Sequence, residues 1–182
     1  MALTVVYAAD TGHVVGALAL TGTSTGTGAP PDVAALVGRE LPLRVSLGGG
    51  RTATLPLNAR ELAVAAVDDE PAALTDPLAF GVELTAEGKP KPTLLRLPTW
   101  TDSGSIALAA DGLTVTVGVP VARPAKVVAL VSDDQDTHVL AGEVPAQQTG
   151  VKLPLTLTPG GTHGVLVLVA GWAGRLEKQG VT

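Results

Sequence analysis

The sequence predicts an all-β protein built from two similar antiparallel β-sandwich-like halves, with at most one short helix. Three observations lead to this fold class. Apolar and polar residues alternate along several stretches, turn-forming clusters of Gly, Asp and Pro recur roughly ten residues apart, and one block of sequence recurs in the second half of the chain. Short strands separated by regular turns are typical of a sandwich or barrel.

The elements of the first half follow from local pattern. Pro and Asp before an Ala- and Val-rich turn, with Gly38 after it, predict a short helix at residues 32–37. Strict alternation predicts a half-buried strand at Leu41–Leu47. Residues 58–67 mix helix-forming and β-branched residues, and we expect a strand in their second half. Residues 78–97 read as a hairpin.

The second half is predicted from the same signals. Residues 106–121 read as another hairpin, and alternation predicts strands at Leu113–Val121 and Leu153–Thr158. The run Gly164–Ala170 is apolar on both faces, which is typical of a central strand.

An internal repeat relates the two halves. Leu41–Leu55 aligns without gaps with Leu153–Val167, and both segments contain a Leu-Pro-Leu strand, a Gly-Gly turn and a second strand. A second pair of similar segments lies upstream, at residues 5–14 and 127–139. Chance similarity between Thr-, Leu- and Gly-rich β sequences is the alternative, but the shared order of the blocks favours duplication.

The duplication hypothesis also predicts the domain organisation. It places one half at residues 1–98 and the other at residues 105–182. Their boundary falls near residues 98–104, where Trp100 lies among turn-forming residues.

A resemblance to known domains covers mainly residues 105–174. Leu157–Val169 resembles the turn into the penultimate strand of immunoglobulin-like and fibronectin-type-III-like domains. This resemblance implies two packed antiparallel sheets. In those families a Tyr commonly occupies the corner before this strand, whereas His163 or Gly164 stands there in this sequence.

Composition excludes several classes of function. The 182 residues include no Cys, so there is no disulfide framework, thiolate metal site or Cys nucleophile. The net charge of −5 gives no electrostatic footprint for nucleic acid. The most apolar run, residues 164–174, is shorter than a membrane helix requires, and the first ten residues lack the basic region of a Sec signal peptide. We therefore expect a soluble protein in the cytoplasm or in an assembled particle, with no membrane insertion.

The chain has three histidines, His13, His138 and His163. His13 and His138 occupy matching positions of the repeat, so we expect them to lie apart rather than converge on a metal. The spacing of Ser, His and Asp residues does not exclude a catalytic triad, but the Gly-x-Ser-x-Gly motif that would support one is absent, and Ser24 and Ser103 lie outside such a context.

Three further groups invite a functional interpretation. The acidic clusters Asp68–Glu70 and Asp133–Asp136 offer carboxylates to calcium but read better as polar hairpin tips. Gly22–Gly28 lacks the Lys of a phosphate-binding loop. Trp100 and Trp172 would suit either a sugar-stacking platform or core packing. We accordingly predict no catalytic, cofactor-binding or metal-binding residues, and no cofactor.

The sequence thus predicts a non-enzymatic structural module that binds protein partners as a homo-oligomer or in a larger assembly. The hypothesis is a subunit of a self-assembling particle, such as a phage-like tail, a contractile injection apparatus or a capsid decoration. The alternative is a carbohydrate-binding or adhesive sandwich, which predicts an exposed Trp100 or Trp172. A hydrolase ranks third.

Overall fold

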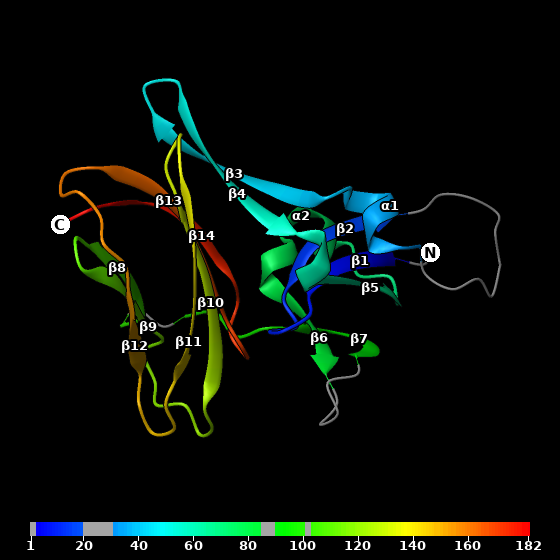
Figure 1. Cartoon of the computed structure of the whole chain (residues 1–182). Helices are drawn as coiled ribbons and strands as arrows, with labels where there is room; N and C mark the ends of the chain where they lie inside the picture. The colour runs from blue at the N-terminus through cyan, green and yellow to red at the C-terminus, as the bar shows by residue number, and fades with distance from the viewer. Residues whose placement is uncertain (1–2, 20–30, 85–89, 101–102) are drawn as a thin grey trace. The chain divides into compact units, whose positions relative to one another are not determined.

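The computed structural model describes residues 3–19, 31–84, 90–100 and 103–182 (Figure 1). Antiparallel strands dominate these residues, and the protein is all-β as predicted. The chain divides into two compact units. The first comprises residues 1–41 and 57–97, and the second comprises residues 42–56 and 98–182.

The first unit contains a three-stranded sheet and a hairpin. In the sheet, β1 (Leu3–Ala8) lies between β2 (Val14–Ala19) and β5 (Leu62–Val67) and is buried along its whole length. The hairpin pairs β6 (Phe80–Leu84) with β7 (Pro90–Arg96). Side chains of the sheet and the hairpin, including Tyr7 and Phe80, share one apolar core. The strand expected in the second half of residues 58–67 and the hairpin expected at 78–97 are both confirmed.

Two helices and two 3₁₀ turns accompany these strands in the described residues. Helix α1 (Val33–Val37) is the predicted one, and 3₁₀ turn η1 (Ala59–Glu61) precedes β5. The expectation of at most one helix needs correction, because helix α2 (Ala72–Thr75) adds one turn before 3₁₀ turn η2 (Pro77–Ala79). The carboxylate of Glu70 accepts the Ala72 N–H, and Ala73 is buried, so a side-chain contact and packing stabilise this turn.

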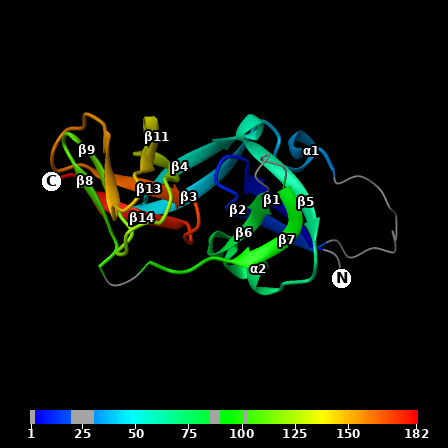
Figure 2. The same ribbon diagram turned by 90° about the horizontal axis from the view of Figure 1, so that it is seen from below.

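The second unit is a sandwich of two antiparallel sheets, visible as two layers in Figures 1 and 2. One sheet has the order β12-β9-β8 and the other has the order β11-β10-β13-β14. Val and Leu side chains from both sheets form one core between them. Strand β13 is apolar on both faces and lies between β10 and β14, which confirms the predicted central strand.

The strands of the three-stranded sheet are β8 (Ser105–Ala109), β9 (Gly112–Thr116) and β12 (Gly150–Pro154). Those of the four-stranded sheet are β10 (Ala125–Ser132), β11 (Thr137–Val144), β13 (Thr162–Val169) and β14 (Arg175–Gly180).

Two of the strands in this unit are shorter than expected. The strand predicted at 113–121 ends at Thr116, because Gly118 has a φ of 81° and Pro120 cannot donate to a ladder. The strand predicted at 153–158 ends at Pro154. The hairpin of β8 and β9 is confirmed.

A two-stranded arm completes the second unit. Strands β3 (Glu40–Gly48) and β4 (Arg51–Asn58) pair with each other, and residues 42–56, which we call the hairpin arm, belong to the second unit. Its turn is built on Gly48, Gly49 and Gly50, whose φ angles of 92°, 60° and 77° favour glycine. The arm lies against β13 at Gly164, where an added Cβ would come within 2.9 Å of the Ala53 Cβ.

The units differ from the predicted halves at this arm. The break at residues 97/98 lies next to the expected boundary, but residues 42–56 were expected in the first half. The repeated segments also differ in pairing. The upstream pair forms hairpins in both units, β1 with β2 and β10 with β11. Downstream, β3 pairs with β4, whereas β12 and β13 lie in different sheets. Common descent of the two halves stays a prediction.

Candidate functional site

The structure brings together two of the three histidines. His138 on β11 and His163 on β13 line one pocket of about 300 Å³ in the second unit. Pairing through β10 explains this, because Val131 lies opposite His138 and the adjacent Ser132 lies opposite Gly164. The remaining residues of the pocket are Asp133, Asp136, Thr156, Leu157, Thr158 and Gly161.

His13 lies in the other unit, as expected from its place in the repeat. Its side chain is fully buried, and Nδ1 lies 2.8 Å from the hydroxyl of Thr11. It contributes to the packing of the first unit and has no part in the pocket of His138 and His163.

The acidic turn between β10 and β11 is held by its own first carboxylate. Asp133 Oδ1 accepts the backbone N–H groups of Gln135 and Asp136, each at 2.7 Å. These bonds, that from Asp136 first, hold the pKa of Asp133 below its ordinary value. The carboxylate therefore stays ionised, and one of its oxygens is already occupied by the turn.

His163 is buried beside this carboxylate. Its residue surface is 7% exposed, and its Nε2 lies 3.7 Å from Asp133 Oδ2, beyond hydrogen-bond distance. Nδ1 is buried and has no hydrogen-bond partner in the structure. Burial lowers the pKa of His163, and the charge of Asp133 only partly opposes this effect. The imidazole is consequently neutral near pH 7.

Asp134 and Ser132 join the turn to the hairpin arm. The guanidinium of Arg51 donates to both oxygens of Asp134, with Nη2–Oδ1 at 2.9 Å and Nε–Oδ2 at 3.1 Å. This bidentate contact lowers the pKa of Asp134. The Ser132 hydroxyl donates to the Thr54 carbonyl at 2.8 Å. Both contacts bind the turn to the arm rather than leaving it open to a ligand.

Most of the carboxylates around this pocket are engaged in holding the turn and the arm. Within the residues that the structure describes, no group of three or more His, Asp and Glu side chains is arranged to hold a metal ion. Proton transfer would need a group whose pKa lies near neutrality and whose titrating atom reaches a ligand. Asp133 and Asp134 have lowered pKa values, and the free nitrogen of His163 is buried.

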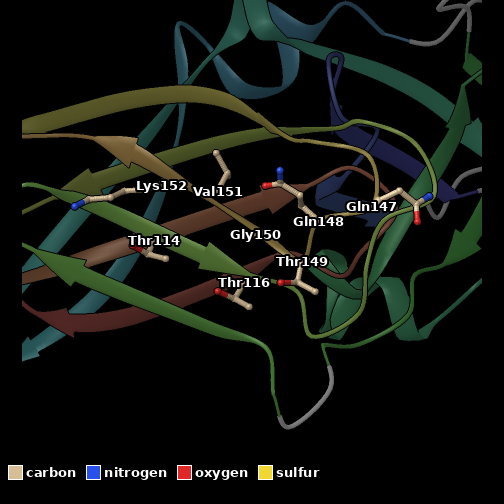
Figure 3. A pocket seen from close by; sticks show the side chains of 8 residues that line it. All are labelled: Thr114, Thr116, Gln147, Gln148, Thr149, Gly150, Val151 and Lys152. Carbon is tan, nitrogen blue, oxygen red and sulfur yellow. The ribbon is translucent and has the colours of Figure 1, made fainter.

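A second depression lies on the three-stranded sheet (Figure 3). Its volume is about 470 Å³, and it is lined by β9, β12 and the segment before β12. The only charged group among its lining residues, the ammonium of Lys152, pairs with Asp111. Gln147 has a φ of 66°, the one positive value of a non-glycine residue in the described chain. The lining side chains otherwise offer hydroxyls and amides, namely those of Thr114, Thr116, Gln147, Gln148 and Thr149.

Both tryptophans pack against the core of the second unit. Trp100 donates its indole N–H to the Ala173 carbonyl at 2.9 Å, and the guanidinium of Arg175 lies over its ring at 4.8 Å. Trp172 is likewise half-buried against this core. Neither ring is exposed as a stacking platform, in contrast to the expectation of the carbohydrate-binding alternative.

The other sequence candidates do not converge on a site. Asp68–Glu70 precede helix α2, and the carboxylate of Glu70 bonds to the backbone there. The Ser103 hydroxyl donates to the Gly118 carbonyl. Gly22–Gly28 and Ser24 lie outside the described residues.

Comparison with protein family models, curated proteins and solved structures gives no match. Among the described residues, no helix has the length and apolar character needed to cross a membrane. The functional interpretation consequently depends on the geometry described above.

Proposed function

We propose that this protein is a non-enzymatic structural module that binds protein partners and acts as a subunit of a self-assembling particle. A phage-like tail, a contractile injection apparatus or a capsid decoration is the kind of particle that we have in mind. The observation that carries this proposal is the hairpin arm, which interrupts the first unit in sequence and packs on a sheet of the second unit, to which it belongs.

The contact between the arm and β13 has the physical character of an interface between subunits. Leu47, Ala53 and Leu55 on the arm are buried, and Ala53 and Leu55 approach β13 at Gly164. Around this apolar contact lie a bidentate ion pair and a hydrogen bond to Ser132. An apolar centre with a polar rim is the usual anatomy of a protein–protein interface. A chain that already uses such docking internally is suited to the same mode between copies.

The strand order of the second unit supports a fibronectin-type-III-like sandwich as the building block. Apart from the arm, the unit has seven strands, β8 to β14. The first, second and fifth of these (β8, β9 and β12) form one sheet, and the third, fourth, sixth and seventh (β10, β11, β13 and β14) form the other. Constant-type immunoglobulin domains instead keep the fourth strand with the first two. Such sandwiches host many unrelated functions, so this likeness concerns architecture and not activity.

The polar cluster supports a structural role over an enzymatic one. Asp133 closes its own turn, Asp134 holds the arm through Arg51, and Ser132 bonds to the arm backbone. These groups are engaged in holding the unit together, so we propose no catalytic step for them. The half-buried tryptophans give no observation that favours the carbohydrate-binding alternative.

The proposal is tested by the mass of the whole chain in solution. Light scattering coupled to size exclusion should give a mass above 18.2 kDa that rises with protein concentration. Negative-stain microscopy at the highest concentration should show rings, tubes or other repeating particles. A monomer at every concentration, with no protein co-purifying from the native source, would contradict the proposal.

A further inference from the structure

Strand β11 is the least protected sheet edge in the second unit. It pairs with β10 on one side only, and within the described residues no backbone hydrogen bond is found on its other side. The Thr137 hydroxyl at its start donates to the Thr54 carbonyl of the arm, and Leu153 of β12 packs against Gly142 on its inner face. Val139 near its middle is 62% exposed. Its eight residues carry a single carboxylate, Glu143, and no Lys, Arg or Pro. Long edges with few charged residues are templates for pairing with another strand.

The other sheet edges of this unit have features that hinder pairing with a further strand. β14 presents Arg175, Glu177 and Lys178, and charged side chains discourage edge pairing. β12 contains Lys152 and ends at a proline. The backbone of β8 is bonded by the last residue of the chain, because Thr182 N–H donates to the Leu108 carbonyl and its own carbonyl accepts the Ala110 N–H. β11 has one charged residue, Glu143, no proline, and, in the described chain, no backbone bond from a neighbouring segment on its open side.

The ladder defines which backbone groups of β11 point outward. Bonded and non-bonded pairs alternate in an antiparallel ladder. Asp133 N–H donates to the Asp136 carbonyl, so Asp133 and Asp136 form a bonded pair. Every second residue of β11 after Asp136 is then also bonded to β10, namely His138, Leu140, Gly142 and Val144. The Lys126 carbonyl accepts the Ala170 N–H on the other side of β10, which agrees with this count. The N–H and C=O groups directed away from β10 belong to Thr137, Val139, Ala141 and Glu143.

We propose that β11 pairs antiparallel with β11 of a second copy of this chain, about a two-fold axis at Leu140, to form one continuous sheet. In this register Thr137 lies opposite Glu143 of the second copy, and Val139 lies opposite its Ala141. This inference rests on the proposed assembly function and names the partner and the surface. All four outward-facing residues then lie opposite outward-facing residues of the second copy. A shift of the register by two residues in either direction would lower the number of these pairs.

Side-chain chemistry supports self-pairing in this register. Thr137, Val139, Ala141 and Glu143 are all exposed, and they lie on the face opposite to Leu140, which packs on the core. A two-fold axis perpendicular to the sheet keeps the two cores on the same side, so this outer row continues unbroken into the second copy. Each Glu143 meets a Thr and not a second carboxylate, which avoids like-charge repulsion across the pair. Val139 is covered by an alanine, which leaves room for the β-branched side chain.

Cysteine cross-linking tests the register directly, because the chain contains no Cys of its own. Bonded antiparallel pairs place Cα atoms about 5.5 Å apart, within the range of a disulfide. Mixing full-length Val139→Cys with full-length Ala141→Cys under mild oxidation should give a cross-linked dimer of one copy of each. Either variant alone should cross-link poorly, since like positions lie diagonally at about 7–8 Å. Val119→Cys, at a position 40% exposed in the same unit, is the control for random collision.

A proline variant tests the backbone contacts. Val139→Pro removes one outward N–H from each copy and should weaken self-association by about tenfold or more, whereas Val139→Thr keeps the N–H and should associate like the parent chain. If the chain is oligomeric but the mixed cysteine pair stays uncross-linked and Val139→Pro has no effect, the β11 pairing is overturned while the assembly function stands. A chain that is monomeric throughout overturns both.

Discussion

At the residue scale, His163 combines a structural position with an unmet polar atom. It is the second residue of β13, at the corner where the chain enters this strand. The imidazole fills this corner against Gly161, whose added Cβ would lie 3.2 Å from the ring carbon Cε1. Its Nδ1 finds no partner and its Nε2 only faces a carboxylate. A buried polar atom without a partner costs stability, and protonation would add to that cost.

Acid should therefore weaken the second unit through His163. Burial lowers the pKa of His163 in the folded state, so the unfolded chain binds the proton first as the pH falls below about 6.5. The stabilising effect of the neutral ring is present above pH 6.5 and is lost as the pH falls toward the lowered pKa. This single group can change the free energy of unfolding by no more than about 1.4 kcal/mol per pH unit. Urea unfolding at pH 8, 7, 6 and 5, followed by tryptophan fluorescence, measures this.

The matched variant is His163→Gln, which keeps a polar side chain but does not titrate. The free energy of unfolding of the parent should fall relative to that of the variant between pH 7 and pH 5. Asp133, whose pKa is also lowered, loses its stabilising effect only below its ordinary value of 3.8, so the two groups act in separate pH windows. Parallel pH curves for parent and variant would contradict the role assigned to His163.

At the element scale, sequence pattern identified most strands but not what each packs against. Alternation along Leu41–Leu47 indicates a half-buried strand, yet it carries no information about which unit buries it. Gly164 illustrates the difficulty. In the sequence it is simply the first residue of an apolar run, whereas in the structure its lack of a side chain allows the arm to pack closely on β13. His138 and His163 lie far apart in sequence, and only the position of β10 between their strands brings them to one pocket. Long-range pairing of this kind has no local signal.

The close approach at Gly164 predicts that even a methyl group displaces the arm. In Gly164→Ala the new Cβ would lie 2.9 Å from the Ala53 Cβ and 3.2 Å from the Val45 Cβ, so the arm or β13 must shift. Overpacking of this size costs about 1–3 kcal/mol. We expect lower stability of the second unit and faster amide exchange in residues 42–56. Gly180→Ala is the control, since an added Cβ there meets no atom within 4 Å.

A second-site change separates arm displacement from a general effect on β13. Ala53→Gly removes the nearest atom, so the double variant Ala53→Gly with Gly164→Ala should recover part of the loss and slow the exchange of the arm. Additive losses in the two single variants would show that the contact between Gly164 and Ala53 does not hold the arm.

At the scale of the whole molecule, the two units are not consecutive along the chain, because residues 42–56 belong to the second unit. The second unit takes its arm from between two segments of the first, so a substitution at residues 42–56 acts on a unit formed mainly by residues beyond 98. The aromatic residues make the two units separately observable. Trp100 and Trp172 lie in the second unit, whereas Tyr7 and Phe80 belong to the core of the first.

Two leucine truncations should therefore be distinguished by tryptophan fluorescence. Leu55→Ala in the arm and Leu3→Ala in β1 each remove a side chain that is at most 1% exposed, and each should cost about 2–5 kcal/mol in its own unit. Leu55→Ala should lower the midpoint of the tryptophan transition in urea, although Leu55 is flanked in sequence by the first unit. Leu3→Ala should lower the midpoint of the Tyr7 signal, read as tyrosine emission at shorter wavelength than that of the tryptophans, and leave the tryptophan midpoint nearly unchanged. A tryptophan midpoint that responds to Leu3→Ala and not to Leu55→Ala would mean that the arm does not belong to the second unit in solution.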